Sequence, residues 1–140
     1  MRVFITQLLF KQLSLFKGQT IYTNYQELID FLLTVKNLDE LDQKKAFGFK
    51  KFKGIRESKM YGFDVNKQQG GERLISTLID KKSGLYTSLK LSDREPTFLF
   101  HRIVKHDEQS LAASHDAKKN HSSTDLIRLS SEVETELVKD

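Results

Sequence analysis

Two residues at the ends of predicted strands have the chemistry needed to act on a phosphate. Arg73 follows the turn at residues 70–71 and opens an apolar stretch, and His106 closes a later one. The guanidinium is permanently charged and its forked donors match phosphate oxygens, while a histidine with a pKa of about 6.5 exchanges protons near neutral pH. Together they predict a site that holds an RNA phosphate beside an acid–base group. The structural alternatives are an arginine paired with Asp64 or Glu72 and an inert surface histidine.

The densest positive segment of the chain is residues 44–59, with seven basic residues and one acidic residue. Its three phenylalanines are interleaved with lysines, a composition that can neutralise phosphates and stack on unpaired bases. Alternatively, the phenylalanines are buried and the lysines form a solvated rim. The predicted RNA-binding residues are Lys50, Lys51, Lys53, Arg56, Lys59 and, after a later strand, Lys105.

Charge is distributed unevenly along the chain. Residues 121–140 hold five acidic and two basic residues, which leaves a net charge of +7 on residues 1–120 out of the overall +4. A basic body favours an anionic partner, most commonly nucleic acid, although excess lysine also serves solubility. The length of 140 residues suits one core. We therefore expect a domain at 1–120 and an acidic tail at 121–140.

Several classes of site are disfavoured by what the chain lacks. It has no cysteine for a disulfide or a thiolate metal site, and His115, Asp116 and His121 lack the spacing of zinc ligands. We expect neither a metal nor a cofactor. On a regular strand His101 would lie on the opposite face from His106, so these two are not expected to pair.

The apolar N-terminal run ends at Lys11, well short of the roughly 20 residues that cross a bilayer. No small-residue cleavage site follows it. We therefore expect a cytoplasmic protein with no membrane partner.

The hydrophobic periodicity predicts an α+β fold with an N-terminal strand, one or two helices and an antiparallel meander. Residues 2–10 alternate like a strand, with a helix as the alternative for the second half. Helical spacing from Tyr25 to Val35 predicts a helix capped by Asn24, followed by a short helix at 39–42. The predicted later strands are 60–65, 73–80, 85–91 and 97–105.

Two helical segments are predicted after the meander. Residues 110–119 are rich in alanine and end on lysines, as the helix dipole favours. In the tail, an apolar stripe runs along an acidic segment, which predicts an amphipathic helix. That helix would fold back on the body or dock on a partner.

This order of elements, together with three short motifs, resembles the RelE/ParE-like toxin fold over residues 1–119. The first motif is Phe52-Lys53-Gly54-Ile55, ahead of a predicted strand. The others are Gly71-Glu72-Arg73-Leu74-Ile75, which opens the next strand, and Lys105-His106-Asp107-Glu108-Gln109, which closes the last one.

The resemblance implies a metal-independent endoribonuclease acting on mRNA, because RelE-type members cut mRNA in the ribosomal A site. The 2′-hydroxyl would attack the adjacent phosphate. Arg73 matches the family arginine that grips phosphate, His106 would shuttle protons, and Lys53 and Lys105 would position the backbone. The implied partners are RNA, the ribosome and an antitoxin protein.

The chain also departs from the family pattern. Asp64 stands in a strand where RelE-type nucleases carry lysines, and Ala112 or Ala113 falls near the position of their tyrosine. The alternative is therefore a non-catalytic binding module. It would be a ParE-type inhibitor of a protein target or an accessory domain of a larger nucleic-acid enzyme.

Overall fold

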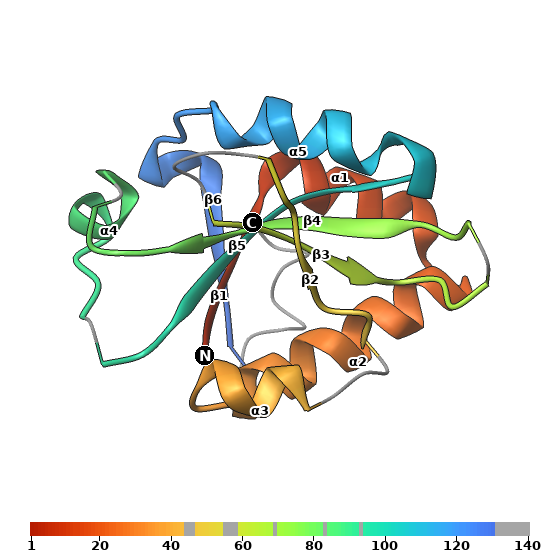
Figure 1. Ribbon diagram of the computed structural model, residues 1–140, viewed down its shortest axis with the longest axis horizontal. Helices are drawn as coiled ribbons and strands as arrows, with labels where there is room; N and C mark the ends of the chain where they lie inside the picture. Colours follow the sequence, from red (N-terminus) through yellow and green to blue (C-terminus); the bar gives the residue numbers. More distant parts are fainter. Residues whose placement is uncertain (44–46, 55–58, 69, 83, 93, 131–140) are drawn as a thin grey trace.

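The computed structural model describes residues 1–43, 47–54, 59–68, 70–82, 84–92 and 94–130 (Figure 1). A six-stranded sheet with the strand order β2-β3-β4-β5-β1-β6 forms its centre. Strand β1 runs parallel to β5, and the other neighbouring strands are antiparallel. The strands are β1 (Arg2–Thr6), β2 (Lys50–Lys51), β3 (Met60–Asp64), β4 (Arg73–Ile79), β5 (Thr97–Val104) and β6 (Leu126–Leu129).

Helices pack on both faces of this sheet, so the α+β class predicted from the sequence is confirmed. They are α1 (Gln7–Phe16), α2 (Thr20–Thr34), α3 (Leu38–Asp42), α4 (Gly84–Ser88) and α5 (Gln109–Ala117), with short 3₁₀ turns η2 (His106–Glu108) and η3 (Ser123–Asp125). Within the described ranges, none of these helices has the length and apolarity needed to cross a bilayer.

One face of the sheet, here called the phenylalanine face, is covered by α1 and α2. Phe63, Phe98 and Phe100 lie fully buried there, and the ring centroids of Phe63 and Phe100 are 5.5 Å apart. The apolar residues of α2 recur at helical spacing and are buried against the same core. The largest hydrophobic cluster of the described chain therefore lies on this face.

The opposite face, here called the histidine face, is covered by two short helices, α4 and α5. Alanines of α5 pack against Met60 and Ile75, while Leu85 of α4 and the leucines just after it pack around Ile79 and Leu99. These are two separate small clusters. His101 of β5 shares this face with Leu99, because side chains two positions apart point the same way.

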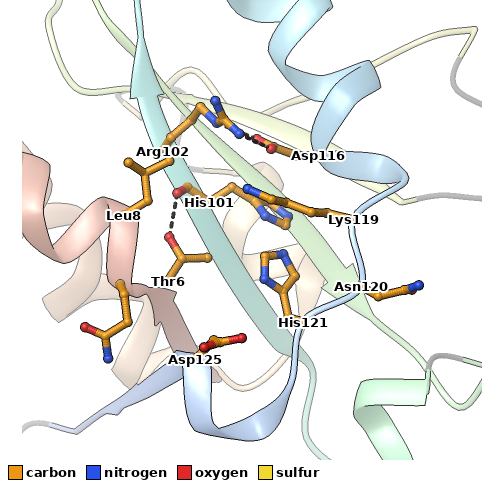
Figure 2. Close-up of a pocket in the computed structure, with 10 residues that line it drawn as sticks. Thr6, Leu8, His101, Arg102, Asp116, Lys119, Asn120, His121 and Asp125 are labelled. Carbon is orange, nitrogen blue, oxygen red and sulfur yellow. Dashed lines mark hydrogen bonds and ion pairs between the residues drawn. The ribbon is translucent and has the colours of Figure 1, made fainter.

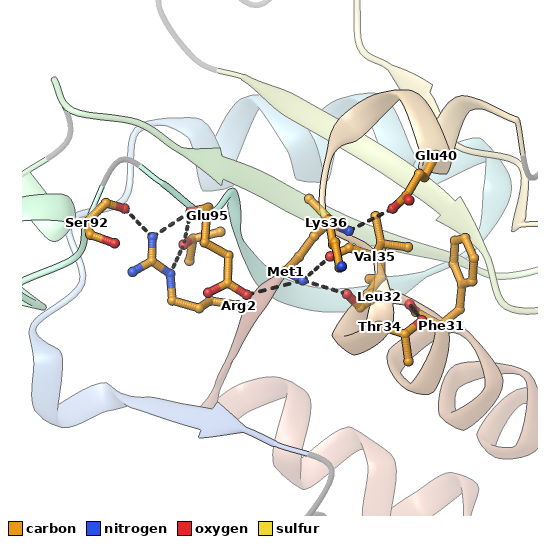
Figure 3. Close-up of polar contacts among 11 residues, drawn as sticks. Met1, Arg2, Phe31, Leu32, Thr34, Val35, Lys36, Glu40, Ser92 and Glu95 are labelled. Carbon is orange, nitrogen blue, oxygen red and sulfur yellow. Dashed lines mark hydrogen bonds and ion pairs between the residues drawn. The ribbon is translucent and has the colours of Figure 1, made fainter.

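Polar contacts fix the start of β1 against its neighbours (Figure 3). The amino nitrogen of Met1 donates to the carbonyl oxygens of Leu32, at 3.0 Å, and Val35 at the end of α2. The Arg2 guanidinium donates to the hydroxyl of Thr97 at 2.9 Å, and Arg2 is also the register partner of Thr97. These contacts help hold β1 in its parallel alignment with β5.

Two sequence-based boundaries near the N-terminus need correction. The predicted strand at 2–10 ends at Thr6, whose hydroxyl accepts a hydrogen bond from the Leu9 amide at 3.1 Å and so caps α1. Helix α2 begins at Thr20 rather than after Asn24. The Asn24 amide instead donates to the carbonyl oxygen of Val65, at 2.9 Å.

The strand predicted at 85–91 was wrong, because α4 occupies Gly84–Ser88 and packs Leu85 on the sheet. The amphipathic helix predicted for 121–140 was wrong over its described part. Ile127 and Leu129 are buried on either side of exposed Arg128, a period of two, and strand β6 pairs with β1. The sheet thus continues beyond residue 120, while residues 131–140 lie outside the described chain.

Candidate functional site

Arg73 lies at the start of β4 with 6% of its surface exposed. Its guanidinium is ion-paired with Asp64 and donates to the Gln109 side-chain oxygen, at 3.2 Å, and to the Gly48 carbonyl, at 3.1 Å. The ion pair with Asp64 matches the structural alternative, in which Arg73 pairs with an acidic residue of the protein. Its role in gripping phosphate remains a prediction that would require at least one of these bonds to be given up.

Gly48 is required for the close approach of the Asp64–Arg73 pair. Its φ of +57° lies in the left-handed region, and a Cβ there would stand 2.0 Å from a carboxylate oxygen of Asp64. The loop backbone can therefore reach the guanidinium only with glycine at this position.

His106 and Lys105 are exposed at the carboxyl end of β5, where Val104 is paired with Arg73. His106 opens the turn η2, and no ring contact or hydrogen bond is recorded for its imidazole in the described chain. The sequence-predicted pair thus lies at one end of the sheet. Only the histidine of that pair is accessible.

The predicted RNA-binding lysines separate into two locations. Lys50 and Lys51 form the edge strand β2, and with Lys53 they are exposed, whereas Arg56 lies outside the described residues. Lys59 is ion-paired with Asp80 at 3.6 Å and lies on the histidine face. We call Lys50, Lys51 and Lys53 the lysine edge.

The phenylalanines of this segment pack inward. Phe47 stacks on Phe31 with ring centroids 5.3 Å apart, and Phe49 stacks on Tyr61 at 4.8 Å. Burial, with the charge of Asp42 as a smaller cause, raises the pKa of the Tyr61 phenol. The lysine edge therefore has the arrangement of the solvated-rim alternative, with cations outside and aromatics against the core.

The histidine face is hollowed where α4 and α5 leave it open. One hollow, of about 210 Å³, reaches the first turn of α1, and a second, of about 250 Å³, reaches α4. Both are lined by His101, Asp116, Lys119, Asn120 and His121. We call the two together the histidine groove, and Figure 2 shows residues that line the first of them.

His101 occupies the floor of the histidine groove with only 3% of its surface exposed. Its Nε2 is 2.6 Å from the Thr77 hydroxyl, which donates to the sulfur of Met60 at 3.0 Å. Because the Thr77 hydroxyl gives its hydrogen to Met60, it must accept from Nε2–H of His101. Nδ1 of His101 then keeps a free lone pair. Nδ1 has no hydrogen-bond partner among the described residues.

His121 faces His101 across the groove, with ring centroids 5.2 Å apart (Figure 2). Its Nε2 is also buried without a partner in the part of the chain described. Burial lowers the pKa of His101 to about 3 and, together with Lys119, lowers the pKa of His121. Asp116 and Asp125 oppose the shift of His121. Both imidazoles are thus neutral at pH 7, and His121 is the easier of the two to protonate.

Basic side chains line both hollows together with carboxylates: Arg102 and Lys119 with Asp116 and Asp125 in the first, and Lys59, Lys82 and Lys119 with Asp80 and Asp116 in the second. The first hollow is lined by the first residues of α1, so the positive end of that helix dipole lies beside the histidines. Lys82 and Lys119 line the groove, and no ion pair of either ammonium is recorded with a described residue. Both carboxylate oxygens of Asp116 accept from Arg102, one of them at 2.9 Å. A third hollow, sharing Lys59 with the second, extends the depression toward Pro96.

Sequence reasoning did not find the His101–His121 pair. It compared His101 only with His106, and it considered His121 only as a zinc ligand with His115 and Asp116. His101 and His121 are 20 positions apart and meet because the chain returns along α5 and η3 to the sheet. The only local signal was a histidine at an inward-facing position of the apolar strand 97–105.

Among the described residues, no group of three or more histidine, aspartate or glutamate side chains is placed to hold a metal ion. No protein-family model, curated protein or solved structure matches this chain.

Proposed function

We propose that the protein binds single-stranded RNA in the histidine groove and cleaves it without a metal, by attack of a 2′-hydroxyl on the adjacent phosphate. The observation that carries the proposal is the pair of facing imidazoles, each with an unpartnered buried ring nitrogen, in a groove flanked by lysines. Buried polar atoms are normally hydrogen-bonded. Two such atoms on neighbouring side chains that line one hollow therefore favour a ligand that supplies their partners.

The arrangement assigns different roles to the two histidines. Neutral His101, with a free Nδ1 lone pair, accepts the 2′-hydroxyl proton as the 2′-oxygen bonds to phosphorus. The bond from phosphorus to the 5′-oxygen breaks, and protonated His121 gives its proton to that oxygen. The products are a 2′,3′-cyclic phosphate and a 5′-hydroxyl end. Lys119 stabilises the negative charge that develops on the phosphate.

A linear polyanion fits this face because the three hollows adjoin one another and lysines occur along them. The lysine edge, at the outer strand of the sheet, adds sequence-independent phosphate contacts. The proposal retains the resemblance to the RelE/ParE-like fold, with mRNA, on or off the ribosome, as substrate. An antitoxin would act by covering the groove. The proposal moves the catalytic roles from Arg73 and His106 to the residues of the histidine groove.

One observation favours the alternative of a binding module without cleavage. The Arg73 guanidinium, which the resemblance assigns to the transition state, is bonded to three partners within the protein. A module that only binds RNA or a protein target would need no free arginine at this position.

Cleavage of a labelled mRNA in EDTA, with and without ribosomes, tests the proposal. General acid–base catalysis contributes about 10²- to 10⁴-fold, so His121→Gln should lose at least a hundredfold in rate. His106→Gln and His115→Gln, both at exposed positions, serve as matched controls and should cleave like wild type. Absence of cleavage by the wild type in both conditions, or equal cleavage by His121→Gln, would exclude catalysis by this pair. RNA binding without cleavage would support the module.

A further inference from the structure

We infer that the hollow between His101, His121 and the first turn of α1 is a receptor for one tetrahedral oxyanion, which enters together with a proton. The inference rests on the proposed function, since the anion would be the phosphate that is cleaved. It adds the source of the proton that His121 later donates.

Three features of this hollow are suited to an anion. The 10-residue helix α1 points its amino end at it, which favours negative charge. Lys119 and Asn120 line it and carry donors. His101 provides the independent sign of a ligand, because only 3% of its surface is exposed and its Nδ1 has no partner in the part of the chain that the structure describes. The volume of about 210 Å³ is several times the roughly 30 Å³ share of one water molecule.

The proton is required by the hydrogen-bonding chemistry of the two rings. A neutral imidazole has one donor and one acceptor nitrogen, and Thr77 already occupies Nε2 of His101. Nδ1 of His101 therefore stays an acceptor, as the proposed base requires, and cannot bind an oxyanion oxygen. The added proton falls on His121: a protonated imidazole has two donors, so His121 then gives the anion a charge-assisted hydrogen bond.

Burial is the main cause that keeps the empty site neutral, and the surrounding charges differ between the two rings. Arg102 and Lys119 oppose a positive charge on His101; Lys119 also opposes one on His121, which Asp116 and Asp125 favour. An oxyanion between the rings would favour the charged form of His121, the ring that the carboxylates already favour. The other charged groups lining the groove are Lys59, Asp80 and Lys82.

Calorimetric titration of the full chain with sulfate tests this inference, because sulfate remains a dianion near neutral pH and carries no proton of its own. Titrations at pH 7 in two buffers of different ionisation enthalpy report the protons taken up. We expect close to one proton per sulfate, and an affinity that falls about tenfold per pH unit between pH 6 and 8. His115→Gln, an exposed control on α5, should behave like wild type.

His121→Gln should lose the proton uptake and bind sulfate at least tenfold more weakly, with its near-UV circular dichroism unchanged. Binding without proton uptake, uptake that persists in His121→Gln, or no sulfate binding would overturn the inference. These outcomes are separate from the RNA assay. RNA cleavage without proton-linked sulfate binding would leave the proposed function standing, and proton-linked binding without cleavage would leave only the anion receptor.

Discussion

The two faces of the sheet use their buried residues differently. On the phenylalanine face, rings of β3 and β5 pack edge-on against one another under α1 and α2. On the histidine face, α4 and α5 leave hollows, and the floor of these hollows carries a buried histidine with a nitrogen that has no partner among the described residues. Apolar packing stabilises the first arrangement, whereas burying an unpartnered polar atom costs free energy. The difference separates the face that maintains the fold from the face that holds the candidate site.

The largest effect should come from the phenylalanine face. Phe98→Ala removes a fully buried ring that contacts Phe63 and Phe100. It should lower the free energy of unfolding by about 3–5 kcal/mol, measured by urea denaturation. A loss below about 1 kcal/mol would show that this face does not carry the core.

The next largest effect concerns Arg73. Arg73→Ala leaves the partly buried Asp64 carboxylate without its partner and should lower the free energy of unfolding by about 2–4 kcal/mol. Asp64→Asn, which keeps the size of the side chain, is the matched variant. Near-wild-type stability of Arg73→Ala, combined with lost RNA affinity, would instead return Arg73 to the phosphate-gripping role.

The histidine face should be sensitive to pH. The pKa of His101 is lowered to about 3 in the folded protein, while an unfolded histidine titrates near 6.5. The unfolded chain therefore binds this proton first as the pH falls, so the stability contributed by neutral His101 is complete above about pH 6.5. It is lost progressively toward pH 3, at up to about 1.4 kcal/mol per unit.

Urea denaturation at pH 7 and pH 5 measures this loss, which should reach about 2 kcal/mol. In His101→Leu the pH dependence should shrink, and stability at pH 7 should be unchanged or higher by about 1 kcal/mol, because an unpartnered polar atom is removed. Equal pH dependence in wild type and His101→Leu would contradict the assignment.

The smallest effect on stability should come from the lysine edge. The double variant Lys50→Glu/Lys51→Glu changes exposed side chains and should alter the free energy of unfolding by less than about 0.5 kcal/mol. RNA affinity should nevertheless fall, with the log–log salt slope reduced by about 2, in fluorescence anisotropy. Lys36→Glu, which follows the end of α2 and changes the net charge by half as much, is the control at another exposed position. An unchanged salt slope would place RNA away from this edge.

Regular periodicity predicted much of the fold. The strands at 60–64, 73–79 and 97–104 and the helix at 109–117 agree with the sequence-based expectations within a few residues. Errors occurred where tertiary contacts decide between states. Leu85 and Leu89 suit either a strand or a helix, and Ile127 and Leu129 are two residues of a pattern that also reads as a helical stripe.

The candidate site was harder to predict because both of its histidines depend on long-range packing. His101 lies on β5, and His121 reaches it from the connection between α5 and η3. By contrast, Arg73 and His106 could be singled out from the sequence, because each stands at the end of a predicted strand. The ion pair of Arg73 with Asp64 was named as an alternative from the sequence. The hydrogen bonds of Arg73 to Gly48 and Gln109 could not be predicted, because the fold brings these residues together.

Histidine-ring NMR during titration with a single-stranded RNA that lacks the attacking 2′-hydroxyl tests the central claim most directly. The chain has four histidines, so each ring can be followed separately. We expect the resonances of His101 and His121 to shift on binding, while those of His106 and His115 stay in place. Shifts at His106 with the groove histidines unmoved would contradict the assignment of the histidine face and restore the site predicted at the end of β5.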